Sequence, residues 1–161
     1  MQKTFNIKNI VQENPLILFS SYTDAQYKWL IEIRKDILKM LKKETYSTKM
    51  HGLVWLWFLG AYEMLRTMDD EKAKDCFSKV IKTDLTKLKI KFAEIRMCFA
   101  KQEYRRNSDD YIHNEISAYG YGNGDISFKI KDKIYSFNSM SKELIEFINK
   151  IQPIDIKNKI L

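Results

Sequence analysis

The sequence predicts a mainly α-helical fold, a bundle of about four long helices followed by a small β-hairpin and a final helix. Apolar residues recur at helical spacing through most of residues 24–106, and the 161-residue chain has only five Gly and two Pro to interrupt helices. The alternation typical of strands is confined to residues 126–137. With 45% hydrophobic residues, a chain of this length is expected to form one domain around one core.

Four parts of this single domain, residues 1–161, follow from the pattern. Residues 1–23 form an N-terminal segment without a clear period, and residues 24–106 hold the helical bundle. Residues 107–124 lose periodicity, and their run YGYGNG predicts a loop. Residues 125–161 are expected to form the hairpin and the C-terminal helix.

The first two helices are marked by a cap and by apolar runs. Thr23 and Asp24 are candidate N-caps of a helix that ends near Lys43. The next helix is apolar on nearly every side from Leu53 to Leu59, and this predicts a central helix surrounded by protein.

Two further helices complete the predicted bundle. Asp69 and Asp70 favour the start of the third, because carboxylates stabilise the positive end of a helix dipole. Thr83 and Asp84 are candidate caps of the fourth. One apolar stripe, at steps of four, three and four, marks its core face: Leu88, Phe92, Ile95 and Phe99.

The last part of the chain changes from helical to strand periodicity. Apolar residues alternate with polar ones over residues 126–130, and a turn at Asp132 leads into a second strand, which predicts a hairpin. Ser141 is the candidate cap of the last helix, which must stop before Pro153.

Several classes of protein are excluded by composition. The longest apolar run, Leu53 to Leu59, is far shorter than the roughly 20 residues of a membrane helix, so no membrane association is expected. The apolar run at residues 16–19 is too short for a signal peptide, which predicts a cytoplasmic protein. Two His and two Cys are scattered without the spacing of a zinc site, so we expect neither a metal nor a cofactor.

Positive charge is concentrated in residues 79–106, which carry nine Lys or Arg against three Asp or Glu. This window accounts for a net +6 of the chain's +7. Such a local excess is typical of a surface that binds phosphates or an acidic protein, although a solvated helix face explains it equally well. The candidate binding residues are Lys87, Lys89, Lys91, Arg96, Lys101 and Arg105.

The central helix also carries a candidate polar cluster. Glu63 and Arg66 are three positions apart, with Asp70 four beyond, so an intrahelical ladder of ion pairs would account for them. Alternatively, Glu63 and Arg66 could meet Arg96 in a buried cluster between two helices. The sequence fits both arrangements.

His113 lies in the segment RRNSDDYIHNE, after Arg106 and Asn107. An Arg that binds a phosphate and a His that shuttles a proton could cleave RNA without a metal, because the 2′-hydroxyl supplies the nucleophile. Arg106, Asn107 and His113 are therefore the candidate catalytic residues of a ribonuclease.

Two stretches, YEMLRTM at Tyr62–Met68 and IRMCFAK at Ile95–Lys101, resemble the HEPN superfamily of small all-helical bundles found in bacterial toxins and defence systems. The resemblance covers roughly residues 24–115. It implies an Arg, often followed by a polar residue, and a His four to six positions further on. In active members this pair belongs to a metal-independent ribonuclease site at a dimer interface.

This motif can be placed in two ways. If Arg96 takes the position of the family's Arg, then Lys101 stands where His should be and Met97 replaces the polar residue, which implies a member that does not cleave. Lys binds phosphate but is a poor base at neutral pH. The alternative placement keeps the three candidate catalytic residues named above. We prefer the first.

A dimer is expected from the same helix. Five positions advance an α-helix by roughly 140°, so Arg96 and Lys101 share a site only if the helix ends or a second subunit completes it. Ile90 and Met97 lie opposite the apolar stripe, which suits a second interface and predicts a homodimer.

The sequence thus favours a HEPN-like binding module, not catalytic, that engages RNA or a cognate protein through its basic helix in a bacterial defence or toxin–antitoxin system. A metal-independent endoribonuclease and a structural subunit of an assembly remain as alternatives.

Overall fold

The computed structural model describes residues 14–43, 47–101, 119–122, 124–130 and 132–157. Its helices are α2 (Leu16–Phe19), α3 (Ser21–Lys42), α4 (Thr48–Met68), α5 (Lys79–Lys101) and α6 (Phe137–Lys150), with single 3₁₀ turns at Lys74–Cys76 and Pro153–Asp155. Its strands are β1 (Tyr119–Gly122), β2 (Asp125–Ile130) and β3 (Lys133–Ser136). The predicted fold class, mainly helical with a hairpin and a final helix, is confirmed.

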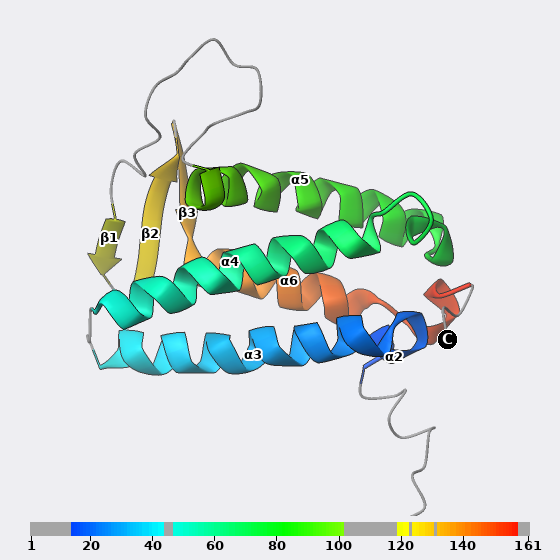
Figure 1. Ribbon diagram of the computed structural model, residues 1–161, viewed down its shortest axis with the longest axis horizontal. Helices are drawn as coiled ribbons and strands as arrows, with labels where there is room; N and C mark the ends of the chain where they lie inside the picture. Colours follow the sequence, from blue (N-terminus) through cyan, green and yellow to red (C-terminus); the bar gives the residue numbers. More distant parts are fainter. Residues whose placement is uncertain (1–13, 44–46, 102–118, 123, 131, 158–161) are drawn as a thin grey trace, which may run out of the picture.

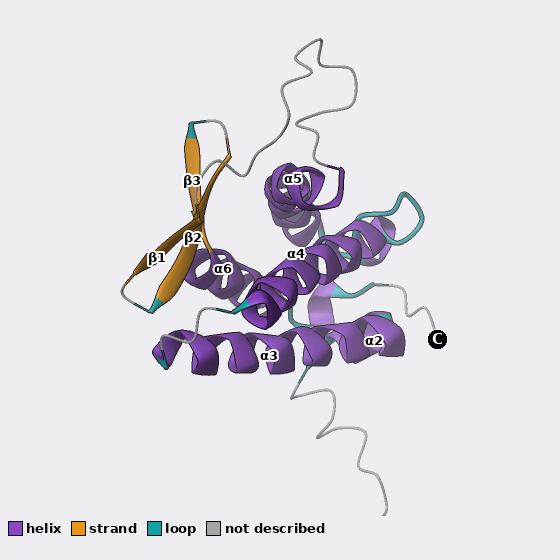
Figure 2. Cartoon of the chain, turned by 60° about the vertical axis from the view of Figure 1, so that its left-hand side comes forward, coloured by secondary structure: helices purple, strands orange, loops and turns teal. Residues whose placement is uncertain are grey.

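The long helices lie side by side with α4 in the middle of the stack (Figure 1). Helix α4 packs on α3 on one side and on α5 on the other, and successive helices run in opposite directions. The small sheet closes one end of the stack (Figure 2), where β2 and β3 pack on α6. Helix α6 also contacts α5, so α5, α6 and the sheet meet along one side of the molecule.

An aromatic cluster joins these layers. Trp57 and Phe58 of α4 are fully buried and contact Phe92 of α5 at ring-centroid distances of 6.0 Å. Phe137 of α6 lies edge-on to Trp57 at 5.2 Å, and Phe128 of β2 lies edge-on to Phe58 at 5.2 Å. Such edge-to-face pairs add to the free energy gained by burying the rings, so this cluster links the bundle and the sheet into one core.

The contact between α3 and α4 depends on a small residue and on one side-chain hydrogen bond. Trp57 Nε1 donates to the carbonyl of Leu30 at 3.0 Å, which satisfies the buried indole N–H. A Cβ at Gly60 would lie 3.2 Å from Leu30 Cδ2, so the glycine allows the two helices to approach closely.

One expectation for the central helix is wrong. Although α4 is central in the stack, it is not surrounded by protein, since Trp55 and Leu56 are 41% and 52% exposed. The elements α3, α5, α6 and β2 all contact α4, but they leave the side that carries Trp55 and Leu56 exposed.

The N-caps differ from those expected. Ser20 caps α3 by accepting from the backbone N–H of Thr23, and Ser136 caps α6 by accepting from Ser139. The expected caps Thr23, Asp24 and Ser141 are instead buried inside the first or second turn of their helices. Ser20 and Ser136 have extended backbones that lead into the helix, which is the property that makes a residue a cap.

The third and fourth predicted helices are also corrected. Asp69 does not begin a helix but is the C-cap of α4, and α5 runs without a break across the candidate caps at residues 83–84. A carboxylate at the negative end of a helix dipole is unfavourable. Here Thr86 donates to Asp69 at 2.8 Å and Lys89 forms an ion pair with it, so α5 supplies the compensating partners.

The sheet has one strand more than predicted. Its order is β1-β2-β3, all antiparallel, and β1 lies within the segment predicted as a loop. Gly120 faces Ser127 so closely that a Cβ would lie 2.8 Å from Ser127 Oγ, which explains a glycine inside a strand. Gly124 has a φ of +69°, as the turn between β1 and β2 requires.

Residues near the C-terminus attach to the start of α5. Phe77 and Ile156 form an isolated antiparallel bridge, and two flanking backbone hydrogen bonds of 2.7 and 2.8 Å join the same segments. Both side chains are buried, so Ile156 is part of the core.

Candidate functional site

The three lysines predicted to form a binding surface lie on two sides of α5. Lys87 and Lys91 are one turn apart, whereas Lys89 is two positions from each and is therefore rotated by roughly 200°. Lys89 pairs with Asp69, whose side chain is 5% exposed, and Lys91 pairs with Glu143 of α6 at 2.5 Å. Lys87 has no ion-pair partner among the described residues.

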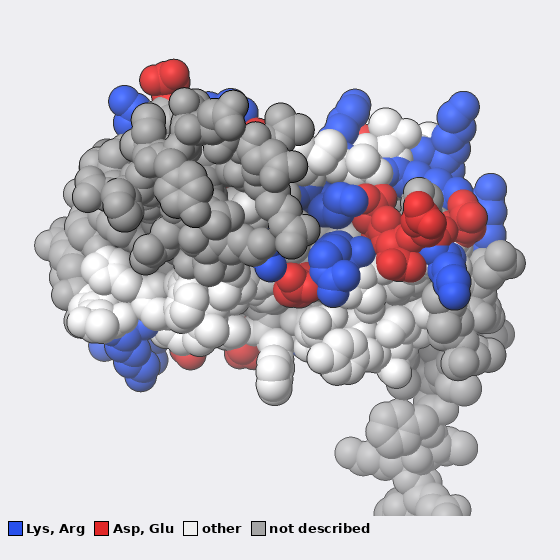
Figure 3. Space-filling view, turned by 45° about the horizontal axis from the view of Figure 1, so that its top comes forward, with Lys and Arg blue, Asp and Glu red and all other residues white. Residues whose placement is uncertain are grey.

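The described surface near α5 has mixed charge. Figure 3 shows acidic side chains between lysines and arginines over part of this face, so the basic side chains there do not form one continuous surface. Lys82 pairs with Asp75 at 2.6 Å, and Lys150 pairs with Asp84 at 2.5 Å. Carboxylates from other elements, Asp69, Asp75 and Glu143, therefore neutralise part of the local excess of positive charge, whereas Lys150 pairs with a carboxylate of α5 itself.

The buried polar cluster is not formed. Arg66 Nε donates to Glu63 Oε2 at 2.7 Å, the intrahelical arrangement, and both side chains are largely exposed. This partner raises the pKa of Arg66, which keeps its positive charge. Arg96 lies over the ring of Tyr62, with its guanidinium carbon 5.2 Å from the ring centroid. Glu63 and Arg66 are one helical turn apart and therefore pair within α4. Arg96 contacts α4 through the ring of Tyr62, so it does not join them.

The other predicted site residues cannot be placed. Lys101 is the last residue of α5, and its side chain lies outside what the structure describes. Arg105, Arg106, Asn107 and His113 also lie outside the described residues. The ribonuclease hypothesis therefore stays a prediction.

A groove of about 650 Å³ runs between α5 and β3 and reaches the start of α6. Its α5 wall includes Lys87, Ile90 and Glu94, and its other wall is formed by all four residues of β3. Successive residues of a strand point to opposite faces of the sheet. A groove lined by four successive residues must therefore lie along the edge of the strand.

Apolar and charged groups share this groove. Ile90 and Ile134 are 56% and 74% exposed and stand on opposite walls. Lys133 Nζ lies 3.0 Å from Glu94 Oε2, and the hydroxyl of Tyr135 donates to the same carboxylate. Burial, together with this acceptor, raises the pKa of Tyr135, so its hydroxyl stays protonated and ties β3 to α5.

The β3 wall was missed by the sequence analysis. The sequence did contain a sign of it: Ile134 and Tyr135 are adjacent apolar residues on a strand, and adjacent side chains cannot both face one core, so one of them had to be exposed.

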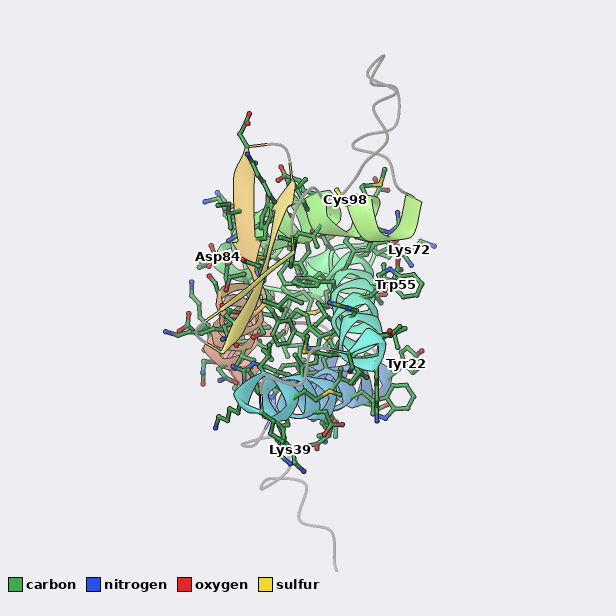
Figure 4. The ribbon with its side chains drawn as sticks, turned by 90° about the vertical axis from the view of Figure 1, so that its left-hand side faces the viewer. Tyr22, Lys39, Trp55, Lys72, Asp84 and Cys98 are labelled. Carbon is green, nitrogen blue, oxygen red and sulfur yellow. The ribbon has the colours of Figure 1, made fainter. Side chains whose placement is uncertain are left out.

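A second apolar surface was also missed: Tyr22 and Trp29, on one side of α3, are 71% and 76% exposed. Figure 4 shows Tyr22 and Trp55 projecting outward on the same side of the molecule.

Neither a metal site nor a membrane span is found in the described ranges. No group of three or more His, Cys, Asp or Glu in them could hold a metal ion. Cys76 and Cys98 are buried and do not form a disulfide. None of the described helices combines the length and apolar character needed to cross a bilayer.

Comparison with known proteins gives no relative. No protein-family model matches the chain, and no curated protein or solved structure shows significant similarity to it.

Proposed function

We propose that this protein is a HEPN-like, non-catalytic binding module that engages a cognate protein through α5 and the groove beside it. The observation that carries the proposal is the exposure of Ile90 and Ile134 along the groove, next to Lys87, which forms no ion pair within the described residues. Exposed apolar residues gathered at a concave site and flanked by charge are typical of protein interfaces.

The same geometry favours a protein over RNA. Binding to RNA gains most of its free energy from cations that contact phosphates. Lys89, Lys91 and Lys133 already contact carboxylates, which leaves Lys87 as the groove cation without an ion pair among the described residues, too few for a run of phosphates. The two isoleucines would gain nothing from phosphates but would be buried by an apolar side chain of a protein partner.

Photo-crosslinking in cells that express the chain tests this proposal. A photo-reactive amino acid in place of Ile90 is compared with the same amino acid in place of Ile154, which is 87% exposed and lies away from the groove on the turn Pro153–Asp155. We expect an adduct at position 90 only, sensitive to protease and resistant to nuclease. Adding Lys87→Glu should weaken it.

The other outcomes contradict the proposal. A nuclease-sensitive adduct would identify RNA as the partner. An adduct with twice the mass of the chain would show that the groove is an interface between two copies. Equal labelling at positions 90 and 154 would show that the groove has no selective partner.

The non-catalytic part is tested separately. Incubation of the purified chain with single-stranded RNA in EDTA should leave the RNA intact. Cleavage that leaves a 2′,3′-cyclic phosphate and disappears in His113→Ala would replace the proposal with the ribonuclease hypothesis.

A further inference from the structure

Among the described residues, the groove beside α5 contains a strand edge without a partner strand. In the sheet order β1-β2-β3 of these residues, strand β3 is hydrogen-bonded to β2 on one side only. Its other edge forms a wall of the groove, opposite α5. Free edges are sites where another chain can add a strand, and proteins usually shield them.

The register shows which groups of β3 face the groove. Ile130 pairs with Lys133 next to the turn, and in an antiparallel ladder hydrogen-bonded and non-hydrogen-bonded pairs alternate. A two-residue turn is closed by a hydrogen-bonded pair, so Lys133 and Tyr135 bond to β2. The backbone N–H and C=O groups of Ile134 and the N–H of Ser136 then point away from β2, toward the open edge, while the C=O of Ser136 belongs to the first turn of α6.

The pairing on the far side of β2 agrees with this register. Gly122 pairs with Asp125 next to the turn between β1 and β2, so Asp125 and Ser127 bond to β1. The residues between them, Ile126 and Phe128, are then free to bond to β3. Both hairpins give β2 the alternation expected of a central strand, and both leave Ile134 and Ser136 facing outward.

We infer that the groove takes an extended acidic and apolar segment of a partner protein, which pairs with β3 as a fourth strand of the sheet. This inference rests on the proposed function and specifies the chemistry of its partner. Backbone hydrogen bonds to β3 would hold the segment, and its side chains would select it. Apolar side chains on the two faces of the added strand would cover Ile90 and Ile134, and a carboxylate would meet Lys87.

Charge argues against a second copy of the same chain as the added strand. Lys133 is already held by Glu94, which leaves Lys87 as the groove cation without an ion pair among the described residues. Strand β3, with the sequence KIYS, has no carboxylate to offer Lys87 of a second copy. An acidic residue in a segment of another protein supplies the opposite charge.

A peptide selection tests the inference. Random peptides of roughly ten residues, long enough for a strand of typical length, are displayed on phage and selected against the full chain. We expect enrichment of sequences in which acidic and β-branched or aromatic residues alternate. Enrichment of none, or of sequences with helical spacing, would overturn the inference.

Backbone methylation of an enriched peptide then tests the pairing itself. Two versions of the peptide are made, each with N-methyl groups on every second residue. In the first frame the methyl groups replace the N–H donors that face β3, and in the second frame they replace the N–H groups that point away from β3. We expect affinity to fall about tenfold or more in the first frame and to change little in the second. Equal effects in both frames would contradict strand addition.

Matched variants of the protein locate the site. Lys87→Glu and Ile134→Ser should each weaken the peptide about tenfold, because one reverses the charge that meets the carboxylate and the other removes an apolar wall. Lys39→Glu, on α3 at the opposite side of the molecule from α5 (Figure 4), and Ile154→Ser are the controls and should change nothing. Equal losses in variants and controls would contradict the site.

The two proposals fail in different ways. If a protein crosslinks at position 90 but backbone methylation has no frame dependence, the module stands and strand addition is wrong. If no selective adduct forms at position 90, the proposed function fails, whatever a displayed peptide does.

Discussion

The two sides of α5 carry similar residues with different roles. One side is buried, with Leu88 and Phe92 packed in the core and Lys89 paired with Asp69. The other side presents Ile90 and Lys87 to the groove. An isoleucine and a lysine in the sequence therefore do not reveal their role, because the elements that pack against each side decide whether a residue stabilises the fold or remains available to a partner.

The largest expected difference between the two sides is in apolar residues. Phe92→Ala should lower the free energy of unfolding by about 3–5 kcal/mol, because it leaves a cavity between Trp57 and Phe58. Ile90→Ala should change it by no more than about 0.5 kcal/mol, since most of that side chain is already in water. Urea unfolding measures both. Equal losses would show that the groove wall is part of the core.

Lysines should show the next largest difference. Lys89→Ala leaves Asp69, with a side chain only 5% exposed, without its cation at the C-terminus of α4, which should cost roughly 1–3 kcal/mol. Lys87→Ala removes an exposed charge that forms no ion pair within the described residues, so its free energy of unfolding should lie within about 0.5 kcal/mol of that of the parent protein. Thermal unfolding at matched salt compares them, and a reversed order would contradict the assignment of Lys89 to the fold.

Alkaline pH should destabilise the fold through Tyr135, which ties β3 to α5. The pKa of Tyr135 is raised in the folded chain above the ordinary value of about 10, by burial first and then by Glu94. A raised pKa contributes stability that is complete below about pH 10 and is lost as the pH rises further. Tyr135→Phe should flatten this alkaline loss in urea unfolding measured as a function of pH. An unchanged slope would mean that Tyr135 does not couple β3 to α5.

The smallest effect is expected at the ion pair between α5 and α6. The hydrogen bond from Lys150 lowers the pKa of Asp84, so this pair contributes stability above the ordinary Asp pKa of about 4 and loses it as the pH falls. Because the pair is exposed, salt should weaken the effect. Lys150→Gln should reduce the acid sensitivity of unfolding slightly. No change at low salt would show that the pair is not formed in solution.

The fold class was predictable because long helices with a buried stripe have a clear period. The stripe of Leu88, Phe92 and Ile95 is buried as expected. The boundaries were less predictable, because several residues near each helix start can cap it and only the path of the preceding chain decides among them. Asp69 was misassigned for a further reason: its compensating partner, Lys89, lies 20 positions away in the sequence.

The candidate site was predicted only in part. Lys87, Lys91 and Ile90 were named from the sequence, and the structure places all three on the groove. The opposite wall comes from β3, more than 30 residues further along the chain, and no local pattern shows that this edge faces α5. The neutralising partners Glu143 and Asp69 likewise belong to other elements, so the charge of the window overstated the charge of the surface.

The bridge between Phe77 and Ile156 has a consequence for how the chain folds as it is synthesised. Helices α3 and α4 can pair as soon as they leave the ribosome, because their contacts are close in sequence. The start of α5 cannot be completed in this way, since residues 155–157 bind there and are made late. Until the ribosome releases these residues, the buried surface around Phe77 stays open to chaperones and proteases.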